Sequence, residues 1–75
     1  MADVLFTFQA GLCLMTASGN LSPPYSGLTI DGAPSVEDAV RRAKRWAATE
    51  DLKEGSYLQI LLDGKGVKTL HPGEF

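Results

Sequence analysis

The chain has 75 residues and a formal net charge of −2, with 44% hydrophobic and 21% charged residues. This composition is typical of one small globular domain, and it excludes a largely disordered chain. No run approaches the ~18 apolar residues of a membrane span, and the start lacks the pattern of a secretory signal, so we expect a single soluble cytoplasmic domain over residues 1–75.

The N-terminal quarter favours β-structure. Residues 3–9 and 12–17 are rich in apolar and β-favouring types. Ala10-Gly11 between them either closes a hairpin or bends one long strand, and we favour the hairpin because glycine permits the positive φ of some tight turns. Residues 18–27 hold two prolines, two glycines and three serines, which predicts a loop.

A strand–turn–helix segment is predicted next. Leu28–Asp31 is expected to be a short strand, and residues 32–34 form the turn after it. Ser35 is a suitable N-cap for the Asp38 amide, and the Asp38 side chain can return a bond to Ser35. Apolar residues then recur at helical spacing: Val36, Ala39, Val40, Ala43, Trp46 and Ala47. The pattern predicts a helix over about 36–49, with Trp46 in the core.

Charges along this helix suit its macrodipole, because acidic residues come first and basic residues follow. Glu37–Arg41 and Asp38–Arg42 have the four-residue spacing of helical ion pairs.

Two more strands follow a charged connector over residues 50–55. Ser56–Leu62 is predicted to be a strand, Asp63-Gly64-Lys65-Gly66 is a strong hairpin signal, and Val67–Leu70 returns. The predicted fold class is therefore α+β. It is an antiparallel sheet of four or five strands in the order ββ(β)αββ, with one helix packed on one face.

One helix covers only one face of such a sheet. Alternation along the strands assigns to that face Val4, Phe6, Phe8, Leu12, Leu14, Leu28, Ile30, Leu58, Ile60 and Leu62. The opposite face then receives Leu5, Thr7, Gln9, Cys13, Met15, Thr29, Tyr57, Gln59, Leu61 and Lys68. Because several of these are large and apolar, we expect an association surface there rather than ordinary scatter. A homodimer fits this surface as well as a foreign partner does.

Catalytic chemistry has few candidate residues. Cys13 and His71 are the single cysteine and the single histidine. Cys13 lies among apolar residues, which do not lower a thiol pKa, so we expect a packed structural thiol and a solvated His71. No spacing matches a phosphate loop, a dinucleotide fingerprint or a zinc site. We therefore expect a protein that is not an enzyme and has no cofactor or metal.

The candidate partner-binding residues are Tyr25, Arg41, Arg42, Arg45, Glu50, Asp51 and Glu54. Tyr25 follows two prolines that stiffen its loop, so it either anchors an interface or folds back onto the core. The helix arginines are most simply a solvated face and next a protein contact. Direct nucleic-acid binding is not expected, because the sequence pI is about 5.1. The three acidic residues in the connector support a protein contact.

The run GLTIDGAPSVEDAV, residues 27–40, resembles the strand–turn–helix segment of HicB-type antitoxins. The matching residues are Gly27, Gly32, Ser35, Glu37, Asp38 and Ala39, although Ala33-Pro34 lengthens the turn. The match spans about a fifth of the chain. This resemblance implies a module that masks a toxin.

In size and architecture the chain also resembles small phage-encoded inhibitors of the anti-CRISPR type, which occupy a surface of a bacterial defence complex. That resemblance implies a non-enzymatic inhibitor in the cytoplasm of a bacterial host cell, with a protein or nucleoprotein complex as partner. We hypothesise inhibition by steric occlusion. The alternatives are the HicB-like antitoxin and a small homodimeric domain that completes an enzyme or a complex.

Overall fold

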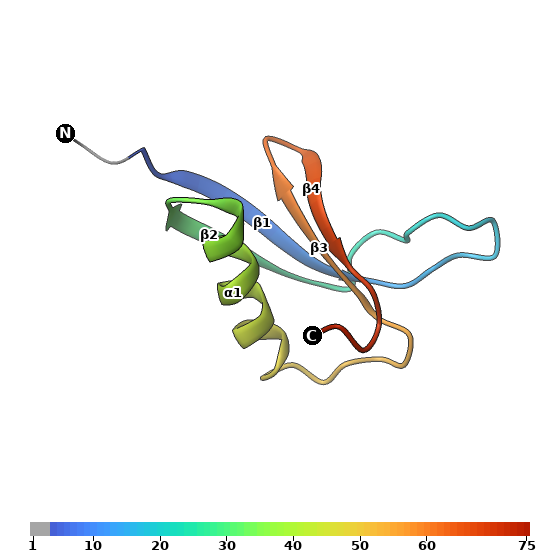
Figure 1. The fold of residues 1–75 in the computed structure, drawn as a ribbon. Helices are drawn as coiled ribbons and strands as arrows, with labels where there is room; N and C mark the ends of the chain where they lie inside the picture. The colour runs from blue at the N-terminus through green and yellow to red at the C-terminus, as the bar shows by residue number, and fades with distance from the viewer. Residues whose placement is uncertain (1–3) are drawn as a thin grey trace.

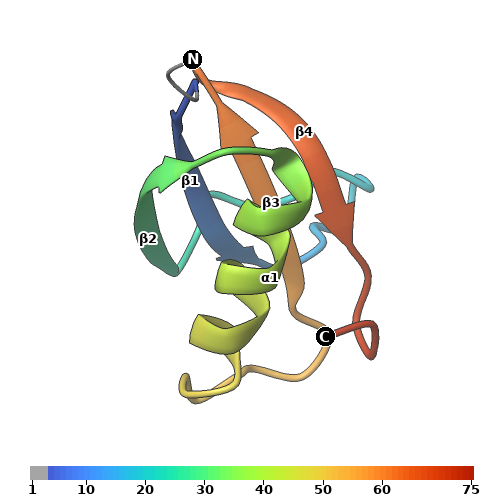
Figure 2. The same cartoon turned by 60° about the vertical axis from the view of Figure 1, so that its left-hand side comes forward.

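A computed structural model describes residues 4–75, which form four strands and one helix (Figure 1). The elements in chain order are β1 (Phe6–Cys13), β2 (Ser26–Ala33), α1 (Val36–Ala47), β3 (Tyr57–Leu62) and β4 (Lys65–Leu70). All strand pairs are antiparallel, the spatial order is β2-β1-β3-β4, and α1 packs on one face (Figure 2). The predicted α+β class is confirmed. Residue 3, the first of the predicted strand over 3–9, lies outside the described residues, as do residues 1 and 2.

The N-terminal region forms one strand, so the predicted hairpin at Ala10-Gly11 is wrong. β1 runs through both residues and pairs with β2 on one side and with β3 on the other. Glycine is favoured at position 11 for a different reason, because a Cβ there would lie 2.9 Å from the Cβ of Pro24. The glycine therefore permits a close approach of the following loop rather than a turn.

That loop runs from Leu14 to Tyr25 and projects from one end of the sheet (Figure 1). An isolated pairing joins Met15 to Leu21, and the amide of Ser22 donates to the carbonyl of Leu14 at 2.7 Å. The predicted loop over 18–27 therefore starts earlier, and the predicted strand over 12–17 ends at Cys13. β2 in turn begins before Leu28, the first residue of the predicted strand.

The core lies between α1 and the facing side of the sheet. Its buried side chains are Phe8, Ala10, Leu12, Ile30, Ala33, Ala39, Ala43, Ala47, Leu58, Ile60 and Leu70. Trp46 packs against this cluster and is half-buried. Val4 and Phe6, predicted to lie in the core, are 68% and 40% exposed. The reason is that Val4 precedes β1 and that β1 pairs with β3 only as far as Phe8, so both residues lie beyond the region that β3 covers.

Ser35 caps α1 as predicted, since its hydroxyl accepts a hydrogen bond from the Asp38 amide at 3.1 Å. The Asp38 carboxylate binds two arginines rather than returning a bond to Ser35. The helix ends at Ala47, slightly before the predicted boundary, and the Thr49 and Glu50 amides close a final turn onto the carbonyls of Trp46 and Ala47.

The β3–β4 hairpin turns at Asp63 and Gly64, whose φ angles are 53° and 78°. Positive φ at both central residues is the geometry of the predicted tight turn. Beyond it, Leu61 lies opposite Gly66 and Ile60 lies opposite Lys68, which leaves an extra residue in β4. This β-bulge places Lys68 on the same face as Ile60, the α1 side, and the prediction that put it on the opposite face is wrong.

Candidate interaction surfaces

Tyr25 folds back onto the protein at the base of the projecting loop. Its ring packs against the core, and its hydroxyl lies 2.6 Å from Ser56 Oγ. The Ser56 hydroxyl donates to the Lys53 carbonyl at 2.5 Å, so the Tyr25 hydroxyl donates to Ser56. It also accepts from the Lys53 amide at 3.2 Å, and Lys53 Nζ lies 4.8 Å from the ring centroid. Of the two alternatives for Tyr25, the structure has the fold-back.

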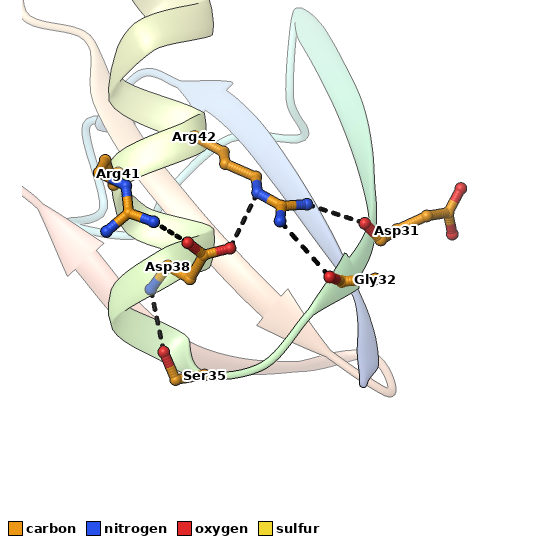
Figure 3. Close-up of polar contacts among 6 residues, drawn as sticks. All are labelled: Asp31, Gly32, Ser35, Asp38, Arg41 and Arg42. Atoms are coloured by element: carbon orange, nitrogen blue, oxygen red, sulfur yellow. Dashed lines mark hydrogen bonds and ion pairs between the residues drawn. The ribbon is translucent and has the colours of Figure 1, made fainter. Parts of the chain in front are cut away.

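Arg42 is also used within the fold (Figure 3). Its Nε lies 2.8 Å from Asp38 Oδ2, and its guanidinium donates to the carbonyls of Asp31 at 2.9 Å and Gly32 at 3.4 Å. Those carbonyls belong to an irregular part of β2, where the register with β1 shifts. A guanidinium suits this position because its fixed fork of donors reaches several acceptors at once. The predicted Asp38–Arg42 ion pair is confirmed.

The other two helix arginines are more exposed to a partner. Arg41 contacts Asp38 Oδ1 rather than its predicted partner Glu37, and 67% of its side chain is exposed. Arg45 lies in the last turn of α1, is exposed, and makes no hydrogen bond or ion pair within residues 4–75. Only part of the predicted basic surface is therefore free.

Of the three acidic candidates, one is also used within the fold and two are exposed to a partner. Glu50 Oε1 accepts a hydrogen bond from the Ser26 hydroxyl at 2.7 Å, which ties the connector to the start of β2. Asp51 and Glu54 are exposed in the connector and make no hydrogen bond or ion pair within the described range. Arg42 binds near the far end of β2, roughly 20 Å from Ser26 at 3.3 Å per residue. Arg42 thus lies away from the connector, whereas Arg45 lies in the last turn of α1, close to the start of the connector.

The sheet face opposite α1 is mainly polar where it is open. Thr7 donates to the Asp31 carboxylate at 3.1 Å, and Thr29 donates to the Gln9 side chain at 3.1 Å. These cross-strand pairs occupy the β1–β2 half of the face.

The apolar residues predicted on that face do not form one patch. Leu5 and Met15 are exposed, at 58% and 46%, but roughly 30 Å of extended chain separates them. Tyr57 is half-buried, with its ring 5.4 Å from the ring of His71, and Leu61 is half-buried as well. The expected continuous association surface is therefore broken into pieces.

Cys13 is a packed thiol, as predicted. It is fully buried, and burial raises the pKa of the thiol. A raised pKa leaves less of the nucleophilic thiolate at neutral pH. The predicted solvated His71 is exposed, and its amide donates to Glu74 Oε1 at 2.6 Å.

No pocket opens in the part of the chain that the structure describes, and residues 4–75 contain no group of three or more acidic, histidine or cysteine side chains arranged to hold a metal ion. No helix within the same range is long and apolar enough to cross a membrane. Comparisons with family models, with curated proteins and with solved structures find no match. A functional proposal therefore has to rest on the exposed surfaces of the fold.

The sequence did not identify the exposed residues of β4 as candidate contact residues. Every residue of this strand except Leu70 is exposed. Lys65 pairs with Leu62 and Lys68 pairs with Ile60, so both lysines lie on the α1 side of the sheet. The available signal was Gly66, because an isolated glycine within a strand often marks a bulge.

Proposed function

We propose that this chain is a non-enzymatic binding protein that covers a surface of a protein partner. The observation that carries the proposal is the run Val4-Leu5-Phe6, whose residues are 68%, 58% and 40% exposed. Three consecutive exposed apolar residues are unfavourable in a free domain unless they serve a contact. Val4 and Leu5 precede β1, and Phe6, its first residue, pairs with β2 but not with β3, which reaches only Phe8.

The exposed apolar area of this run indicates how large a contact it can form. Its exposed area is on the order of 250 Å², which at ~25 cal/mol per Å² corresponds to roughly 6 kcal/mol of gross burial energy. A stable interface covers about 800 Å² on each partner. The run therefore suits the apolar centre of a larger contact, whose remaining area comes from neighbouring polar surface.

The narrower proposal is an inhibitor of a bacterial defence complex of the CRISPR-Cas kind, acting by steric occlusion. A small sheet-plus-helix scaffold supports this partner class, and the burial of Cys13 favours occlusion over thiol chemistry. The residues that resemble HicB-type antitoxins have structural roles of their own: Gly32 has a φ of 68° and Ser35 caps α1. That resemblance therefore adds little support to the antitoxin alternative.

The test is a plaque assay in bacterial strains that each carry one active CRISPR-Cas type and are challenged with a targeted phage. Expression of the chain should restore plaques in at least one strain. The variant Val4→Ser/Leu5→Ser should lose this effect, and the control Met15→Ser/Leu52→Ser, which changes two other exposed apolar residues, should retain it. Immunity that is unchanged in every strain, or a fully active Val4→Ser/Leu5→Ser variant, would contradict the proposal.

A further inference from the structure

The two outer edges of the sheet differ in how they are covered. On β2, Arg42 binds the carbonyls of Asp31 and Gly32 near one end, and Glu50 binds Ser26 at the other. The outer strand β4 has no such cover: within residues 4–75, no side chain of another element forms a hydrogen bond or ion pair with it. An uncovered edge presents backbone N–H and C=O groups to which a further strand can pair.

The bulge gives this edge a specific charge pattern. In a regular strand, side chains three residues apart point to opposite faces. Here Val67 is the extra residue of the bulge and has no partner in β3. Lys65 pairs with Leu62 and Lys68 with Ile60, so both lysines lie on the α1-side face, two pairing positions apart. Two positions correspond to roughly 7 Å along the strand. Both lysines are exposed, and neither forms an ion pair within the described range.

We propose that the outer edge of β4 binds an extended segment of the partner that carries carboxylates at alternate positions. The inference rests on the proposed binding function and names the edge and the chemistry of its ligand. Alternate residues of a strand project from one face about 7 Å apart, which matches the spacing of Lys65 and Lys68. Backbone hydrogen bonds to the edge hold the added strand, and the two lysines favour a strand with acidic side chains over one with basic side chains.

The same lysines disfavour a second copy of this chain as the occupant. Antiparallel pairing of two β4 edges about a two-fold axis brings the lysines of both copies onto one face. Like charges opposite each other destabilise strand pairing, and edge lysines are a common protection against self-association. A nucleic-acid strand would use the lysines but leave the amides of the edge unpaired, so the peptide is the occupant that uses both features.

The experiment follows the amide NMR spectrum of the full chain during titration with a capped peptide of about six residues in which glutamate and valine alternate. Shift changes and slower amide exchange should concentrate on residues 65–69. Lys65→Glu/Lys68→Glu should weaken this binding by about tenfold or more, since two favourable ion pairs become repulsive. The same variant should gain affinity for a matching lysine–valine peptide.

The control Lys44→Glu/Arg45→Glu makes the same change of charge on α1 and should bind the acidic peptide within about twofold of the unchanged chain. A variant whose spectrum shows loss of fold is replaced by Lys65→Gln/Lys68→Gln, which should also weaken binding. Shift changes that map away from β4, an unaffected Lys65→Glu/Lys68→Glu variant, or tighter binding of oligothymidylate at the same residues would overturn the inference.

The outcomes separate this inference from the proposed function. If the peptide binds as expected but no strain loses immunity, the inhibitor proposal fails and the β4 site stands. If immunity is lost and Lys65→Glu/Lys68→Glu is fully active, the β4 inference fails and the inhibitor proposal stands.

Discussion

Replacement of Arg42 by alanine should lower the free energy of unfolding by about 2 kcal/mol, because the Asp38 carboxylate loses an ion-pair partner and two backbone carbonyls lose a hydrogen-bond donor together. Asp38 is 7% exposed, and its Oδ2 lies 2.8 Å from Arg42 Nε. The carbonyls of Asp31 and Gly32 lose partners at 2.9 Å and 3.4 Å.

The magnitude follows from the exposure of each group. Loss of one partner from a fully buried ion pair costs about 3–5 kcal/mol. Here 43% of the Arg42 side chain is exposed and Arg41 still contacts Asp38, so the loss at the carboxylate should be about 1–1.5 kcal/mol. The two carbonyls lie at the sheet edge, where water can replace the guanidinium, and should add about 0.5–1 kcal/mol together.

The assay is urea unfolding followed by the fluorescence of Trp46, the single tryptophan. In a domain of this size, 2 kcal/mol corresponds to a fall in Tm of about 8–16 °C. Arg45→Ala is the matched control, since Arg45 is exposed in the same helix, and it should change stability by less than ~0.5 kcal/mol. A double-mutant cycle with Asp38→Ala should give a coupling of about 1 kcal/mol. If Arg42→Ala is no more destabilising than Arg45→Ala, the account of the β2 edge is refuted.

Three further predictions concern the sheet and the base of the loop. Tyr25→Phe should lose about 1–2 kcal/mol of stability in urea, whereas Tyr57→Phe should lose less, because only the Tyr25 hydroxyl has protein hydrogen-bond partners within the described residues; equal losses would contradict this role. Gly11→Ala should destabilise by about 1–3 kcal/mol through overpacking against the loop, and Gly27→Ala, whose added Cβ would have its nearest contact at 3.5 Å, should cost less in the same assay. Burial raises the pKa of the Cys13 thiol, so the unfolded chain loses this proton first, and stability should fall as pH rises through about 8.5 and beyond. Cys13→Ala should lack that component in unfolding curves at pH 7 and 10, and an identical decline in both proteins would contradict it.

The elements that could be predicted from the sequence are those set by local chemistry. The N-cap at Ser35 and the helical spacing of apolar residues locate α1, and Asp63-Gly64 locates the final hairpin, because each signal lies within a few neighbouring residues. The hairpin predicted at Gly11 is wrong because the residue that requires a glycine there, Pro24, is distant in sequence. A side chain at position 11 would lie too close to Pro24, at the end of the projecting loop.

The candidate site was harder to predict because contacts between elements determine which charges are free. Arg42 lies in a basic segment of sequence, yet the β2 carbonyls that bind it come from another element. Lys68 changes face because of a bulge in the β3–β4 pairing, and alternation alone cannot locate a bulge. For Tyr25, the sequence left two alternatives open, and the hydrogen bond to Ser56 decides between them.

We propose that the chain inhibits its partner by occupying a surface rather than by chemistry. The most direct measurement is a titration of the purified chain into a purified CRISPR effector complex from a strain in which it restores plaques, with binding of target DNA as the readout. Occlusion predicts that inhibition saturates near molar equivalence and does not deepen with longer incubation. Inhibition that progresses with time at a small fraction of an equivalent would show turnover and contradict the account.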